Sequence, residues 1–342
     1  MNRESLLAIG AALSLVASPW SSAGTGSAPV PDTMLAVAFD RSGGPEVLSI
    51  HRLPVPKPSA GEVLIAVYAT GVNVWEAAYR QRAGSDSHFP VVLGSDGSGT
   101  VAAIGSGVRA FKVGDNVYAT GAGFYAEYAT VRADDVAQVP KGISLTEAGI
   151  LATSGLSALQ GIDDVLRLKA GETLIIHGAA GAVGTLAVQF AKLRGVRVLA
   201  TASDDAGLAL VTRLGADTVV NGRTGDIVSA VKRFAPNGVD AVLGFAGGDA
   251  LERCIDALRN DGRGRVAYLY GMEPLPKPRF GMQIILYSFV SGSGEFERLN
   301  KAIEAVRLQV PIAAEYPLAA ATVAHKRLEA GHLLGKIVLR VH

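Results

Sequence analysis

Apolar runs alternate with amphipathic segments through the second half of this chain. Residues 174–176 form an apolar run that predicts a buried strand, and a glycine-rich turn follows it. After the turn, apolar residues recur at the spacing of an amphipathic helix: Val183, Leu186, Ala187, Phe190 and Ala191. Gly195 is expected to end this helix, and residues 196–201 predict the next buried strand.

The same order of strands and helices continues downstream. Strands are predicted at residues 216–220, 239–245 and 265–270, and helices are predicted at 226–234 and 251–258. Alternation of this kind predicts an α/β fold with a parallel, doubly wound sheet and covering helices.

Residues 34–156 show a different pattern. Short apolar runs, such as 35–39 and 62–67, are separated by glycine and proline turns, which predicts a β-rich, barrel-like domain. Beyond residue 295 we expect helices at 298–307 and 319–330. A closing strand at 335–340 is expected to return to the first domain. The ligand cleft is then predicted to lie between the two domains.

The glycine-rich turn has the order of parts of a dinucleotide-binding βαβ unit. Matched to G-x-G-x-x-G, it has Ala179 at the first glycine position, followed by Gly181 and Gly184. We expect its backbone to hold a diphosphate at the helix N-terminus, through Gly178, Ala180, Gly181, Ala182, Val183 and Gly184. A glycine turn without a ligand is the alternative, and the flanking strand and helix disfavour it.

Composition narrows the function classes. The 342 residues suffice for two domains, and a hydrophobic content of 49% supports a large core. With 32 basic and 31 acidic residues the net charge is +1, so there is no basic field to bind nucleic acid. The single cysteine, Cys254, excludes an internal disulfide and a Cys-x-x-Cys zinc lobe, and we expect it to be a packed core thiol.

The N-terminal segment does not fit the fold pattern. A charged start, an apolar stretch at residues 6–17 and small residues at 21–23 are similar to a secretory signal, and the stretch is too short to span a membrane. Either this is an export signal, which implies a periplasmic or secreted protein, or translation starts at Met34. A diffusible coenzyme favours the cytoplasm.

We therefore divide the chain into a signal-like or spurious extension (1–33), a β-rich catalytic domain (34–156), a dinucleotide-binding domain (157–295) and a C-terminal return (296–342).

Six short motifs stand in a fixed order: FDRSGGPEVL (39–48), GVN (71–73), GSDGSGTV (94–101), VGDNV (113–117), AAGAVG (179–184) and GHLLGKIV (331–338). Together they resemble the medium-chain dehydrogenase/reductase superfamily, and within it the zinc-lacking, zeta-crystallin-like quinone oxidoreductases. The resemblance runs from Met34 to the C-terminus. It implies a GroES-like β-rich barrel domain joined to a Rossmann domain with a doubly wound parallel sheet.

The resemblance also implies the absence of a catalytic metal. Zinc-dependent relatives carry a cysteine ligand at the position of Asn73 and a His-Glu pair at the positions of Ser95 and Asp96. In zinc-lacking members, the residue that matches Asn73 lies beside the nicotinamide, which makes it a candidate catalytic and cofactor-binding residue. The sequence offers no cluster of Cys, His and carboxylate ligands that would contradict this.

Three more residues match cofactor contacts of the family. Ser157 matches a threonine on the nicotinamide side, Tyr270 belongs to a backbone stretch near the carboxamide, and Lys336 matches a lysine near the cofactor. Each could instead be an ordinary turn or capping residue.

On the substrate side the chain departs from the family. Ala78 stands where the family often carries a tyrosine, so the neighbouring Tyr79 is the candidate proton donor, with solvent as the alternative. Glu76 stands where the family has an aspartate. We expect this lone carboxylate to face solvent.

The residues at the end of the second strand of the βαβ unit, predicted at 196–201, indicate which coenzyme is used. An acid there grips the ribose hydroxyls of NAD, whereas this chain has Ala202 at that position and Ser203 next to it. NADPH is therefore expected, with NADH possible. The family's lysine and tyrosine are absent here, at Gly207 and Gly222, which leaves Arg223 as the candidate cation for the 2′-phosphate. Asp204 and Asp205 are expected to repel it.

The implied activity is hydride transfer from NADPH to a quinone-type, small-molecule electrophile. Reduction of activated C=C bonds in alkenals, enones or enoyl compounds is the alternative reaction, and a non-catalytic NADPH-binding protein is the alternative from another class. By analogy with relatives we expect a homodimer, without a membrane span and without nucleic acid.

Overall fold

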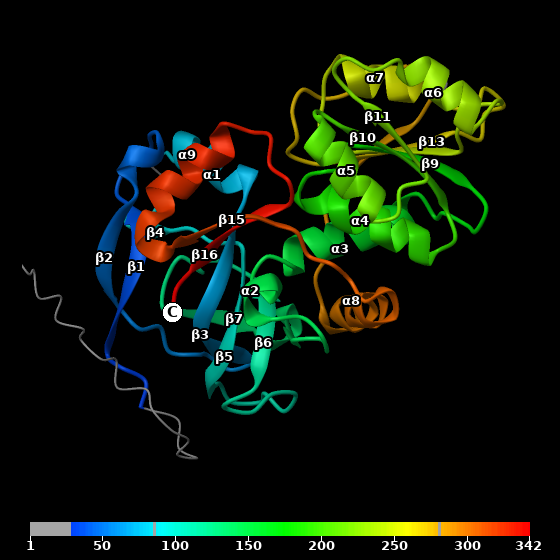
Figure 1. Ribbon diagram of the computed structural model, residues 1–342. Coiled ribbons are helices and arrows are strands. Elements are labelled where there is room, and N and C mark those ends of the chain that lie inside the picture. The colour runs from blue at the N-terminus through cyan, green and yellow to red at the C-terminus, as the bar shows by residue number, and fades with distance from the viewer. Residues whose placement is uncertain (1–28, 85–86, 280–281) are drawn as a thin grey trace, which may run out of the picture.

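Figure 1 shows two lobes, and the main sheet of each lobe is of a different type. The computed structural model describes residues 29–84, 87–279 and 282–342. The signal-like segment lies outside the described residues. Among the helices of the described part, none is both long enough and apolar enough to cross a membrane.

The first sheet has six parallel strands in the order β11-β10-β9-β12-β13-β14, which is the Rossmann strand order. The strands are β9 (Thr173–His177), β10 (Arg197–Ala202), β11 (Thr218–Asn221), β12 (Ala241–Gly244), β13 (Arg265–Leu269) and β14 (Ile284–Tyr287). The sequence patterns predicted the first five of these strands, and β14 was not predicted.

Alternate residues of the central strand enter different cores. Leu174 and Ile176 belong to one hydrophobic cluster, whereas Ile175 belongs to another on the opposite face. This is why β9 is apolar at successive positions, as expected of a strand covered on both sides. The covering helices are α4 (Ala182–Leu193), α5 (Asp205–Arg213), α6 (Ile227–Phe234) and α7 (Asp249–Asp256).

The second lobe is β-rich and mainly antiparallel. Its larger sheet has the order β15-β16-β3-β5-β6-β8, with β7 also paired to β3, and a smaller sheet has the order β2-β1-β4. The strands are β1 (Thr33–Phe39), β2 (Ser49–Pro54), β3 (Glu62–Val72), β4 (Val91–Val92), β5 (Asp96–Ile104), β6 (Asn116–Thr120), β7 (Tyr128–Arg132), β8 (Val136–Gln138), β15 (Ile312–Pro317) and β16 (Lys336–Arg340). At the C-terminal end, β16 pairs with β3, opposing Val338 to Gly71, so this strand is part of the larger sheet of the β-rich lobe.

Helices join and cap the lobes. They are α1 (Val74–Arg82), α2 (Leu145–Ala148), α3 (Ala152–Gln160), α8 (Ser293–Val306) and α9 (Ala321–Glu329). Every residue of α3 is buried, and this helix packs against α4, α8 and β6. The expected domain boundary between residues 156 and 157 falls inside this helix. The expected α/β fold, with a Rossmann sheet and a GroES-like domain, is confirmed.

Candidate active site

Backbone geometry shapes the glycine-rich turn between β9 and α4. Gly178 has a φ of +77°, in the left-handed region that favours glycine. A Cβ added at Gly184 would lie 2.5 Å from the Gly178 carbonyl oxygen, whereas at Gly181 the nearest atom would be 3.5 Å away. The packing of the turn on its helix therefore requires Gly184, and Gly181 leaves open space beside the turn.

This turn can bind an anion. The helix α4 begins at Ala182, so the amides of Ala182, Val183 and Gly184 have no partner within the helix. These amides and the positive end of the helix dipole suit a diphosphate. The residues present therefore fit the diphosphate of a dinucleotide.

Two hollows meet at the turn. The first, of about 230 Å³, is lined mainly by apolar side chains, including Val72, Trp75, Phe245, Met272 and Leu333, and by the polar Asn73, Ser154 and Lys336. The second, of about 460 Å³, extends to the ends of β10 and β11. Both are lined by Gly178, Gly181, Phe245, His332 and Leu333. One elongated ligand can therefore run from the first hollow across the turn into the second.

Asn73 stands at the first hollow with its amide held by two carboxylates. Its Nδ2 donates to Glu76 Oε1 at 3.0 Å and to Asp96 Oδ1 at 3.2 Å. An amide nitrogen has two protons, so these bonds use both. Oδ1 is then the atom that Asn73 can offer to a ligand, and it acts only as an acceptor.

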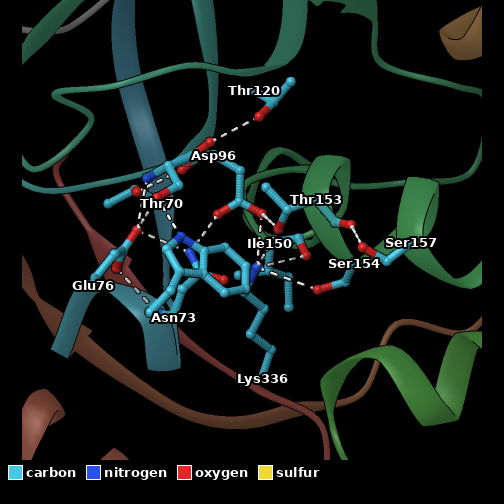
Figure 2. Close-up of polar contacts among 12 residues, drawn as sticks. Thr70, Asn73, Glu76, Asp96, Thr120, Ile150, Thr153, Ser154, Ser157 and Lys336 are labelled. Carbon is cyan, nitrogen blue, oxygen red and sulfur yellow. Dashed lines mark hydrogen bonds and ion pairs between the residues drawn. The ribbon is translucent and has the colours of Figure 1, made fainter. Parts of the chain in front are cut away.

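Asp96 is held in turn by a buried ion pair. Lys336 Nζ donates to Asp96 Oδ2 at 2.7 Å and to the hydroxyl oxygens of Thr153 and Ser154 at 3.1 and 3.3 Å. Thr153 Oγ1 donates to the same Asp96 oxygen at 2.6 Å. Figure 2 shows these side chains pointing toward one another. The ion pair joins β5, α3 and β16.

Glu76 does not face solvent, which corrects our expectation for this carboxylate. It is 2% exposed, and five donor groups bind it. Its Oε1 accepts from Asn73 Nδ2 and from the amide and hydroxyl of Ser95, and its Oε2 accepts from the Asn73 amide and the Tyr125 hydroxyl. Burial raises the pKa of Glu76 above its ordinary value, and the bonds from Asn73 and Ser95 oppose this rise.

The Glu76 network extends to α9. Tyr125 donates its proton to Glu76, so its oxygen accepts from His325 Nε2 at 3.1 Å. This bond fixes the tautomer, because His325 Nδ1 is buried without a partner among the described residues. Burial lowers the pKa of His325 to about 3, and the Arg80 guanidinium contributes to the decrease. His325 is therefore neutral at neutral pH.

The second hollow contains the expected ribose-binding residues. Ser203 follows β10, Arg223 follows β11, and both line the hollow. Asp204 Oδ1 accepts from the Gly207 amide at 2.7 Å and caps α5, so this carboxylate already has a partner at the helix N-terminus. None of the described residues that line this hollow is acidic.

Comparisons with known proteins agree with this geometry. Residues 59–141 match the alcohol dehydrogenase GroES-like domain family, and residues 182–305 match the zinc-binding dehydrogenase family. The quinone oxidoreductase of Mus musculus is 32% identical over 322 residues, which cover 90% of this chain and 97% of that protein. This chain belongs to the quinone oxidoreductase family.

Solved structures place the family in the medium-chain dehydrogenase/reductase superfamily. An NAD-dependent alcohol dehydrogenase is similar with a TM-score of 0.82 and 31% identity, over 90% of this chain and 100% of that one. The Escherichia coli quinone oxidoreductase, solved with NADPH, is similar with a TM-score of 0.78 and 25% identity, over 90% and 99% of the two chains. The expected family and the enzyme class, an oxidoreductase, are confirmed.

Not every residue expected from the quinone oxidoreductase family reaches the cleft. Asn73 and Lys336 line the first hollow, as do the amides of the turn. Ser157 Oγ instead donates to the Thr153 carbonyl oxygen inside α3, and Ser154, one turn earlier, lines the hollow. Tyr270 is 71% exposed and is not part of the lining. Leu269 and Met272 on either side of this stretch line the first hollow, so the expected backbone contact near Tyr270 stays a prediction.

Tyr79 also lies outside both hollows. It is 48% exposed, its hydroxyl is 3.4 Å from Ser87 Oγ, and its ring packs against Phe39. It stands on α1 beyond the network of Asn73 and Glu76, which occupies the start of that helix.

Among the cleft residues that the sequence analysis missed, Trp75 and His332 carry polar side-chain groups that take part in the contacts of the site. Trp75 lines the first hollow, and its indole Nε1 donates to Ser95 Oγ at 2.8 Å, which links the indole to Glu76. His332 lines both hollows, although its position in the sequence indicated only a turn. A tryptophan two residues after Asn73 was a usable signal, whereas nothing near His332 in the sequence indicated its contacts.

Proposed function

We propose that this chain is an NADPH-dependent oxidoreductase that transfers hydride to a quinone-type acceptor without a catalytic metal. The observation that carries the proposal is the continuous cleft, in which a turn with free amides joins an apolar hollow to a second hollow. The second hollow is lined by Ser203, Arg223 and His332 among others, and none of its described lining residues is acidic. When bound, NADPH supplies the hydride from its nicotinamide. The residues of this chain bind, orient and exclude water.

The hydrogen-bonded side chains around Asn73, which form one wall of the first hollow, position the ligand in this proposal. Because both amide protons are bound by carboxylates, Asn73 Oδ1 accepts a hydrogen bond from the nicotinamide carboxamide or from a hydroxyl group. Four acceptors surround the Lys336 ammonium: the Asp96 carboxylate, the Ile150 carbonyl oxygen and the hydroxyl oxygens of Thr153 and Ser154. Lys336 therefore fixes this wall and does not supply a proton. With Tyr79 outside the cleft, solvent is the proton source that we favour.

The chemistry of the donor groups supports zinc independence. A zinc ion takes deprotonated or neutral donors that are free to coordinate it. Here Asp96 is paired with Lys336, and Glu76 already accepts five hydrogen bonds. Among the described residues, no group of three or more His, Cys, Asp and Glu side chains is arranged to hold a metal ion. We expect turnover to be unchanged after treatment with a zinc chelator.

Turnover with a panel of acceptors tests the activity. NADPH oxidation is measured with 1,4-benzoquinone, with a short enal and without an acceptor. Faster oxidation with the quinone supports the proposal, and faster oxidation with the enal shows a C=C reductase instead. Binding of NADPH by calorimetry without turnover on either acceptor shows a non-catalytic binder. The proposal is overturned if calorimetry detects binding of neither NADPH nor NADH.

Replacing Ser203 with Asp tests the coenzyme preference. The new carboxylate would repel the 2′-phosphate and could bind the ribose hydroxyls of NADH. We expect the ratio of kcat/KM for NADPH over NADH to fall by about 30-fold, which corresponds to about 2 kcal/mol. Ser87→Asp, a replacement of the same type outside the cleft, is the control. An unchanged ratio in Ser203→Asp would show that the phosphate binds elsewhere.

The domain boundaries, the homodimer and the cytoplasmic location stay predictions. Size-exclusion chromatography with light scattering measures the subunit number. The intact mass of the native protein distinguishes a start at Met1 from one at Met34 and from a cleaved signal.

A further inference from the structure

The second hollow lacks two groups that the family places around a 2′-phosphate. The lysine is replaced by Gly207 and the tyrosine by Gly222. Arg223 alone would leave the phosphate with one charged partner from the Rossmann domain. The structure brings a third residue, His332, to the same hollow from the other side of the cleft.

His332 belongs to the loop between α9 and β16, so it comes from the C-terminal return rather than from the Rossmann sheet. A hydrogen bond of 3.3 Å joins its Nδ1 to Ser203 Oγ. The imidazole is exposed, and within the described residues its Nε2 makes no hydrogen bond. Ser203 Oγ and one ring nitrogen of His332 therefore face the same hollow from opposite sides of the cleft.

The backbone holds His332 in an unfavourable conformation. Its φ of +51° lies in the left-handed region, where residues other than glycine are uncommon and strain collects at functional sites. Arg327 donates to the Gly331 carbonyl oxygen at 2.7 Å and to the His332 carbonyl oxygen at 3.2 Å. The Gly335 amide donates to the Ala180 carbonyl oxygen at 2.9 Å, which anchors the loop to the glycine turn. The loop is thus fixed at both ends.

The charges around His332 favour an anion. Arg223 lines the same hollow as His332, and Arg327 donates to the His332 carbonyl oxygen. No acidic side chain occurs in the described lining. A phosphate group at this place would meet the Ser203 hydroxyl, the Arg223 guanidinium and the His332 imidazole together.

We propose that His332, with Ser203 and Arg223, forms the subsite for the 2′-phosphate of NADPH and replaces the missing lysine and tyrosine. This inference rests on the proposed NADPH-dependent function. It makes both domains partners of one phosphate, because Ser203 and Arg223 come from the Rossmann domain and His332 comes from the C-terminal return. The 2′-phosphate then links the two sides of the cleft, which NADH cannot do at this place.

Calorimetric binding of two fragments tests the subsite without turnover. The probes are 2′,5′-ADP and 5′-AMP, which differ by the 2′-phosphate. We expect the wild-type protein to bind 2′,5′-ADP at least about tenfold more tightly than 5′-AMP. In His332→Asn, the affinity for 2′,5′-ADP should fall about tenfold, and the affinity for 5′-AMP should change by less than about twofold.

His332→Asn is chosen because asparagine tolerates the left-handed region better than histidine. The variant should therefore unfold at the wild-type temperature or above it, so that lost affinity cannot come from a damaged fold. His332→Arg places a cationic hydrogen-bond donor at this position and should retain the preference for 2′,5′-ADP. His88→Asn, at an exposed histidine outside the hollow, is the matched control.

Each result has a distinct meaning. If His332→Asn weakens both fragments equally, or neither of them, the subsite is wrong while the proposed function stands. Equal wild-type affinities for the two fragments also overturn the subsite. If the wild type binds neither fragment and neither NADPH nor NADH, the proposed function itself fails.

Discussion

The two walls of the cleft are built by different means. On the Rossmann side, the main chain forms the surface, with Gly178, Gly181 and Gly184 and the free amides at the start of α4. On the side of the β-rich domain, side chains form it, with Asn73 and Asp96 locked into a buried network (Figure 2). The Rossmann wall depends on glycines that have no Cβ atom. The wall of the β-rich domain depends on a network in which the buried polar groups are hydrogen-bonded to one another.

This difference decides how each wall responds to change. In a wall made of backbone, an added side-chain atom disturbs either the packing of the turn or the space for the ligand. Removing a side chain elsewhere has little effect on such a wall. A buried polar network fails when one member is removed, since the others are left unpaired in a medium of low dielectric. Substitutions on the two sides should therefore act by opposite mechanisms.

The largest expected effect is on the side of the network. Lys336→Met leaves the Asp96 carboxylate buried without its cation, which should lower the free energy of unfolding by about 3–5 kcal/mol. Chemical denaturation measures this. Lys301→Met breaks an exposed ion pair with Glu297 and should leave the free energy of unfolding nearly unchanged. Similar losses in the two variants would contradict the importance of burial.

A matched pair of substitutions tests the wall made of backbone. In Gly184→Ala the new Cβ would overlap the Gly178 carbonyl oxygen and the Ala179 Cα at 2.5 and 2.6 Å, which should destabilise the fold by about 3 kcal/mol. Gly181→Ala meets no protein atom nearer than 3.5 Å and has a φ of −79°, so its melting temperature should stay unchanged.

The same pair of variants distinguishes an effect on folding from an effect on coenzyme binding. Alanine at position 181 occupies the space next to the amides of α4, and the affinity for NADPH should fall at least about tenfold by calorimetry. If Gly181→Ala binds NADPH as tightly as the wild type, the diphosphate does not approach this turn.

The smallest expected effect of a single group on stability is the contribution of a buried histidine to its dependence on pH. Burial lowers the pKa of His325 to about 3 and that of His177 to about 4, below the ordinary value of 6.5. Between these values the unfolded state binds protons that the folded state does not, so stability falls as the pH decreases below 6.5. At about pH 5 each histidine should contribute a loss of about 2 kcal/mol.

Thermal unfolding at several pH values measures this dependence. His325→Gln should reduce the loss of stability between pH 6.5 and about pH 5 by roughly half, and the exposed His88→Gln should leave it unchanged. The raised pKa of Glu76 acts in the opposite direction, since the folded state then binds a proton more readily than the unfolded state. A His325→Gln variant whose stability changes with pH as that of the wild type does would show that His325 is not buried in the neutral form.

Much of the Rossmann wall could be predicted from sequence, because its determinants are local. The strand, the glycines and the helix occupy one continuous stretch, and their spacing carries the geometry. The network wall could not be predicted in the same way. Glu76 binds Ser95 and Tyr125, which lie 19 and 49 residues away, so a carboxylate that looked isolated in sequence is fully paired in space.

The same reason explains the missed residue of the second hollow. Ser203 and His332 are separated by 129 positions, and only the return of the chain to the β-rich domain brings them together. Asn73 and Lys336, which the family motifs indicated, line the first hollow from the end of β3 and the start of β16. Ser157 does not, because its hydroxyl binds the backbone of its own helix.

The strand β16 has a consequence for how the protein is made. Lys336 on this strand completes the pairing of Asp96, and Gly335 just before it binds the glycine turn. Ribosomes synthesise residues 331–340 after every other element of the cleft. A nascent chain can therefore fold its Rossmann sheet while it is still being translated, yet it must wait for this segment before it can retain a coenzyme.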